Sequence, residues 1–112
     1  MMRGLLLLLV ACSPPLTIDD YPCPPGGTPL TYESFGRTFL AQHCNDCHGA
    51  DAGDRHGAPE AYHFDTIDQV RKRRDRIFVR AAASNTTMPP GPYDPDSDDR
   101  ERLADWLACG AP

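Results

Sequence analysis

The chain has 112 residues, with 11 basic and 16 acidic side chains that give a formal net charge of −5 at pH 7. This length allows one small domain, and the acidic balance argues against a nucleic-acid partner. Hydrophobic residues make up 40% of the chain, and many of them fall in the first eleven positions, so the rest is poor in core material.

The N-terminus has the pattern of an export signal. A short positive start, which includes Arg3, precedes the apolar run GLLLLLVA over residues 4–11. This run is too short to span a bilayer, which takes about 20 apolar residues. Residues 1–11 are therefore predicted to be a signal peptide. Its removal leaves ten basic and sixteen acidic side chains, a net charge of −6.

The end of this segment resembles a bacterial lipobox, because Leu9-Val10-Ala11 precedes Cys12. The resemblance implies that Cys12 is lipidated and becomes the mature N-terminus, with several acyl chains as a stable membrane anchor. The alternative is an ordinary signal peptide, but no A-x-A-like cleavage site follows. Ser13 resembles the sorting preference of outer-membrane lipoproteins. We therefore expect a protein that faces the periplasm, with the outer membrane slightly favoured over the inner one.

Residues 12–30 are predicted to be a tether. The stretch 13–29 holds six prolines and no periodic apolar pattern. Such segments are extended, at about 3.1 Å per residue. If Cys23 is bound to a cysteine of the domain, the free tether runs from Ser13 to Pro22 and reaches roughly 30 Å.

The first helix is predicted at about Tyr32–Gln42, with Thr31 as a possible N-cap. Its apolar residues recur at helical spacing and are Tyr32, Phe35, Phe39 and Leu40. This helix leads directly into residues 44–48, which read C-N-D-C-H.

The C-x-x-C-H pattern is the signature of covalent c-type haem attachment. Cys44 and Cys47 can each add to one vinyl group of a porphyrin, and His48 can then take an axial position on the iron. A zinc site would need four ligands, and no second C-x-x-C is present. A thioredoxin-like dithiol would need a βαβ context. One covalent haem c is therefore the predicted cofactor.

Two more helices are predicted after the motif. The second runs from about Thr66 to Ser84, with Asp65 as its N-cap. The third runs from about Ser97 to Cys109 and ends at Gly110. No strand-like run occurs, so the fold class is all-α.

This order of elements resembles small monohaem class I c-type cytochromes over residues 31–112. The resemblance implies a cytochrome c-like fold of about three main helices wrapped around one covalent haem. It also implies that the last helix crosses the first one at Gly36, where an aromatic or aliphatic residue follows at Phe39 or Leu40. The residues placed for this crossing are Leu103, Trp106 and Leu107.

Met88 is the leading candidate for the second axial ligand. It is the only methionine after the signal peptide, and two prolines follow it. Pro89 disfavours helical geometry at Met88, and the loop resembles the methionine-ligand loop of the family. Bis-histidine ligation through His56 or His63 is the open alternative. Met/His ligation raises the reduction potential relative to bis-His.

An iron-bound histidine normally donates its other ring N–H to an acceptor that orients it. In the family, that acceptor is a backbone carbonyl about a dozen residues after the histidine, in a Gly-Pro pair. The carbonyl of Pro59, in the run Gly57-Ala58-Pro59, is the corresponding candidate here.

Cys23 and Cys109 remain after the other cysteines are assigned. In an oxidising compartment this pair is most simply a disulfide, although two free thiols stay an alternative. A loop of this length would stabilise the fold by about 4–5 kcal/mol in the chain-entropy model.

Together these patterns predict an electron-transfer protein that shuttles single electrons between redox partner proteins, with a membrane anchor at Cys12, and not an enzyme. Two alternatives stay open: a five-coordinate haem gas sensor, and a non-haem lipoprotein stabilised by a disulfide or zinc. A charge run is usually a solvated face, but the basic second helix and the acidic stretch 94–105 could also steer a partner.

Overall fold

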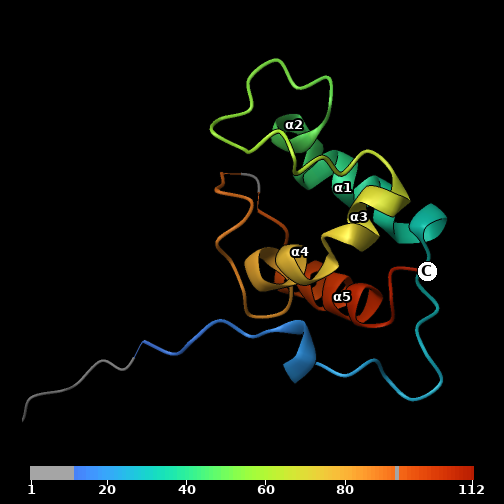
Figure 1. The fold of residues 1–112 in the computed structure, drawn as a ribbon. Coiled ribbons are helices and arrows are strands. Elements are labelled where there is room, and N and C mark those ends of the chain that lie inside the picture. The colour runs from blue at the N-terminus through green and yellow to red at the C-terminus, as the bar shows by residue number, and fades with distance from the viewer. Residues whose placement is uncertain (1–11, 93) are drawn as a thin grey trace, which may run out of the picture.

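The computed structural model describes residues 12–92 and 94–112 (Figure 1). This part of the chain contains helices and no strand, which confirms the all-α class. The predicted signal peptide, residues 1–11, lies outside the described residues. The order of elements is η1 (Ile18–Asp20), η2 (Tyr32–Gly36), α1 (Arg37–His43), α2 (Asn45–His48), α3 (Ile67–Lys72), α4 (Arg74–Ala81) and α5 (Ser97–Ala108).

The first predicted helix is present as two consecutive elements, a π-helical turn η2 and the α-helix α1. Thr31 is its N-cap, as predicted, and its hydroxyl accepts a hydrogen bond from the Ser34 amide at 3.0 Å. The helix ends at His43, and the short helix α2 carries the C-x-x-C-H motif immediately afterwards.

The second predicted helix is divided into α3 and α4 at Arg73, whose φ of −114° and ψ of 18° interrupt the helical geometry. The predicted N-cap Asp65 was wrong by one residue. Thr66 caps α3 in a reciprocal box with Gln69, whose side chain accepts from the Thr66 amide at 3.0 Å. Thr66 is the better N-cap because its capping box with Gln69 satisfies two free backbone donors at once. Helix α4 ends at Ala81 rather than Ser84, since Ala82 is extended.

The last helix, α5, matches its prediction closely. Asp96 precedes it as N-cap and accepts a hydrogen bond from the Asp99 amide at 2.8 Å. At the other end Gly110 has a φ of +96°, the left-handed conformation in which glycine commonly ends a helix.

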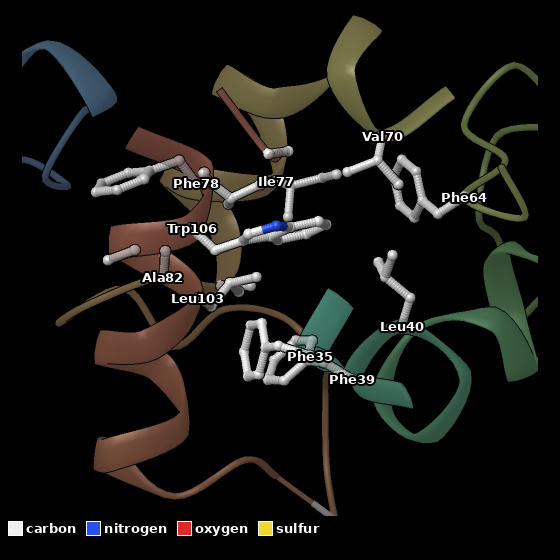
Figure 2. Packing of buried hydrophobic residues seen from close by; sticks show 14 of the residues in the cluster. Phe35, Phe39, Leu40, Phe64, Val70, Ile77, Phe78, Ala82, Leu103 and Trp106 are labelled. Atoms are coloured by element: carbon white, nitrogen blue, oxygen red, sulfur yellow. The ribbon is translucent and has the colours of Figure 1, made fainter. Parts of the chain in front are cut away.

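The core lies between η2, α1, α4 and α5, with Trp106 fully buried at its centre (Figure 2). A Cβ atom on Gly36 would overlap the indole ring of Trp106. The ring of Phe35 meets the same indole edge-on, with centroids 6.0 Å apart. The predicted contact between the first and last helices at Gly36 is therefore confirmed, because only glycine leaves room for the indole.

The N-terminal segment is not a free tether along its whole length. Residues 16–23, which we call the strap, lie along α4 and α5 (Figure 1). Cys23 is bonded to Cys109 with a Cα–Cα distance of 4.8 Å, which confirms the predicted disulfide. Since Leu16 is already attached to the domain, the free part after Cys12 is only residues 13–15. The reach expected from residues 13–22 was therefore too long.

In the described residues, no helix combines the length and apolar character that a membrane span requires.

Candidate functional site

A cavity of about 370 Å³ lies between α2, the loop 49–64, α4 and the segment that follows α4. This volume falls within the range of ligand pockets, about 300–1,000 Å³. Its lining includes Cys47, His48 and Met88, so three of the predicted haem-binding residues meet at one place. Apolar side chains such as Phe64 and Ile77 complete the walls.

His48 is the last residue of α2 and has a fixed orientation. Its Nδ1 donates a hydrogen bond to the carbonyl oxygen of Tyr62 at 2.8 Å. Its ring also lies against Phe64, with centroids 4.7 Å apart. Burial lowers the pKa of His48 below its ordinary value. A neutral imidazole with Nδ1 engaged keeps the lone pair of Nε2 available for a metal.

The predicted acceptor for His48, the carbonyl of Pro59, was wrong. That oxygen accepts instead from the Arg55 guanidinium at 2.9 Å and from the Tyr62 amide at 3.0 Å. Arg55 also donates to the carbonyl of Gly49, which ties the start of the loop to its middle. The turn that uses the Pro59 carbonyl places Tyr62, three residues later, next to the imidazole. Sequence spacing could not indicate this turn.

The two motif cysteines have different environments. Cys47 lines the cavity, whereas Cys44 is not part of its lining and sits half-buried where α1 meets α2. Both are free thiols. Burial raises the pKa of Cys44 to about 12, so this side chain stays protonated at neutral pH.

Met88 is half-buried and lines the cavity, although the backbone around it is irregular. Its amide donates to the carbonyl of Arg80 at 2.8 Å. Its own carbonyl accepts from the guanidinium of Arg100 at 2.9 Å. Two backbone hydrogen bonds therefore hold the methionine segment to α4 and α5.

The two rival histidines are separated by the structure. His56 lines the same cavity as His48 and lies 3.6 Å from the carboxylate of Asp54. His63 lines a different, smaller hollow beside Glu60 and Arg73. Of the two, His56 is thus the one that shares a cavity with His48.

Sequence reasoning missed the arginines of this cavity. Arg76 and Arg80, one turn apart on α4, line it together with Arg55, and no carboxylate belongs to the lining. The Nε atom of Arg80 is buried and has no hydrogen-bond partner among the described residues. The spacing of Arg76 and Arg80 along the helix places them on one face, but a charge run by itself predicts only a solvated face. The cavity is therefore apolar with a cationic wall.

Among residues 12–92 and 94–112, no group of three or more His, Cys, Asp and Glu side chains is arranged to hold a metal ion. Comparison with known proteins gave no match: no family model fits the chain, and neither the curated proteins nor the solved structures include a significant relative. The fold and the chemistry of the cavity are therefore the basis for a functional proposal.

Proposed function

We propose that this protein is a small c-type cytochrome that transfers single electrons through one haem held in the cavity. The observation that carries the proposal is the meeting of His48 and Met88 on one cavity, beside Cys47. The C-x-x-C-H motif and the resemblance to class I cytochromes c support the same assignment. A bound haem supplies a reversible one-electron iron couple.

The residues of the cavity fit such a group. Cys47 lines the cavity and Cys44 lies three residues earlier, outside the lining, and each thiol could add its S–H across one vinyl double bond, with no leaving group. His48, oriented through Nδ1, would offer Nε2 to the iron, and the Met88 thioether would be the second protein ligand. The apolar walls suit the porphyrin, and Arg76 and Arg80 offer cationic partners for its two carboxylates.

An iron held by both residues would have no free position for a substrate, so we assign no catalytic residue. The electron donor and acceptor would be redox proteins outside the cytoplasm. We propose that Cys12, exposed at the start of the described chain, carries the lipid anchor to the periplasmic side of a membrane.

Pyridine haemochrome measurement on the purified mature protein tests the cofactor. We expect one covalent haem per chain, lost in the double variant Cys44→Ala/Cys47→Ala. The matched control is Asp46→Ala, which changes an exposed residue between the two cysteines, leaves both thiols in place and should retain the haem. A wild-type protein exported with an active haem-attachment system and still without covalent haem would end the proposal.

The sixth ligand has its own test, because Met88 and His56 share the cavity. Oxidised Met/His haem should show a weak far-red absorption band. We expect Met88→Ala to lose this band and His56→Ala to keep it. A wild-type protein without this band, whose haem spectrum changes in His56→Ala and not in Met88→Ala, would assign the ligand to His56 and predict a lower reduction potential.

A further inference from the structure

The segment that carries Met88 has no regular structure of its own. We call residues 82–88 the Met88 loop. It leaves α4 at Ala82, and Ala83 has a φ of +53°. The position of the Met88 side chain therefore depends on what holds this loop from outside.

Arg100 of α5 holds the loop from one side. The residue is only 4% exposed, and its Nη1 lies 2.8, 3.0 and 2.9 Å from the carbonyl oxygens of Ala81, Asn85 and Met88. Its backbone carbonyl accepts from the Ala83 amide at 3.0 Å. A buried guanidinium is retained only when hydrogen bonds compensate for lost water. Here the three carbonyls belong to the residue just before the loop, a residue within it and its last residue.

The strap holds the loop from the other side, through Asn85. This side chain is 7% exposed and uses both halves of its carboxamide. Its Oδ1 accepts from the Leu16 amide at 3.1 Å, and its Nδ2 donates to the Leu16 carbonyl at 2.7 Å. The same Nδ2 lies 3.0 Å from the Phe78 carbonyl. Asn85 thus joins the strap, α4 and the loop three residues before Met88.

The strap is itself secured at several points. The ring of Tyr21 lies against Phe78, with centroids 5.6 Å apart. Its hydroxyl lies 2.9 Å from the Glu101 carboxylate and 3.1 Å from that of Asp105. The disulfide between Cys23 and Cys109 ties its end to α5. The strap therefore gives Leu16 a fixed position against which Asn85 can pair.

We propose that the strap is a splint for the sixth haem ligand, with Asn85 and Arg100 as the positioning residues that keep Met88 at the cavity. This inference rests on the proposed function and adds to it. When the splint is loosened, the fraction of molecules with Met88 correctly placed falls. An external ligand then competes more successfully for the iron.

Imidazole binding to the oxidised haem protein tests this role, with loss of the far-red band as the signal. We expect Asn85→Ala to bind imidazole about tenfold more tightly than wild type. The matched control is Ser84→Ala, an exposed neighbour on the same loop, which should bind as wild type does. Arg100→Gln, which retains a donor but loses the charge and the fork, should act in the same direction as Asn85→Ala.

A second pair of variants acts from the strap and leaves the buried loop residues in place. Leu16→Pro removes the amide that donates to Asn85, whereas Leu16→Ala keeps it. We expect Leu16→Pro to increase imidazole affinity beyond Leu16→Ala. Hydrogen exchange at the Met88 amide should also accelerate about tenfold in Leu16→Pro, and this measurement does not depend on the haem.

The outcomes separate the two proposals. Absence of covalent haem ends the proposed function, and hydrogen exchange then still decides whether the strap immobilises the Met88 loop. Haem without a far-red band in wild type would remove Met88 as ligand and overturn the splint. Unchanged imidazole affinity and unchanged exchange in both Asn85→Ala and Leu16→Pro would also overturn it.

Discussion

Single residues decide how closely the first and last helices approach. Gly36 is buried, and any side chain there meets the indole of Trp106. The indole has little freedom to move, because its N–H donates to the carbonyl of Pro112 at 3.1 Å and its ring is fully buried. A residue without a side chain is thus required on steric grounds.

The variant Gly36→Ala should destabilise the fold by about 1–3 kcal/mol through overpacking. Urea unfolding of the purified protein measures this loss. Gly53→Ala is the matched control, because a Cβ at Gly53 meets nothing within 4 Å. Its effect should stay within about 0.5 kcal/mol. Equal midpoints for Gly36→Ala and wild type would contradict the packing argument.

At the scale of elements, several arginines of the basic run in α3 and α4 connect different parts of the fold instead of facing only solvent. Arg71 and Arg74, at the end of α3 and the start of α4, donate to the carbonyls of Ala111 and Leu107 at 3.1 Å each. They thereby satisfy acceptors at and beyond the end of α5. Arg73 lies over the ring of Tyr62 at 4.3 Å, and the carbonyl of the same residue orients His48. Part of the basic run therefore stabilises the packing of α3 and α4 against the end of α5 and the loop 49–64.

The N-cap of α5 can be tested in isolation. Asp96→Ala removes the acceptor of the Asp99 amide and should destabilise the protein by about 0.5–2 kcal/mol. Asp96→Asn keeps an acceptor oxygen and should restore most of the loss, since asparagine is an equally good cap. Thermal unfolding followed by circular dichroism checks both. If Asn were as harmful as Ala, the charge rather than the cap would be the stabilising feature.

The strap should respond to alkaline pH. Burial and the nearby carboxylates of Glu101 and Asp105 raise the pKa of Tyr21 above its ordinary value of 10.0. The folded protein therefore keeps the phenol proton that the unfolded chain releases. This contribution to stability is fully present below about pH 10 and is lost as pH rises further. Stability measured between pH 9 and 11 should fall less in Tyr21→Phe than in wild type, and parallel curves would contradict this.

At the scale of the whole molecule, the disulfide closes most of the chain into one loop. Cys23 and Cys109 are separated by 86 positions, and the bond ties the strap to the end of α5. Crosslinks over long loops restrict the unfolded chain most strongly in the chain-entropy model. The small core makes this contribution a large share of the total stability.

The double variant Cys23→Ser/Cys109→Ser should lose about 2–5 kcal/mol of stability. Guanidinium unfolding measures this difference. Ser84→Ala is the control, because Ser84 is exposed and lies outside the disulfide. A double variant as stable as Ser84→Ala would show that the strap contacts alone hold the fold.

The sequence alone determined the local features of this protein. Helical spacing, capping residues and the glycine after α5 are encoded within a few residues of where they act, so they could be predicted. The C-x-x-C-H motif likewise predicts covalent haem attachment from adjacent residues. Pairing of Cys23 with Cys109 could be inferred as well, because few other cysteines remained.

Only the tertiary structure decided the features that depend on distant segments. The acceptor of His48 is Tyr62 rather than Pro59, because a turn in the intervening loop uses the Pro59 carbonyl. The cationic wall of the cavity and the pairing of Leu16 with Asn85 have the same origin. Each arises when packing brings together groups whose separation along the chain carries no periodic signal.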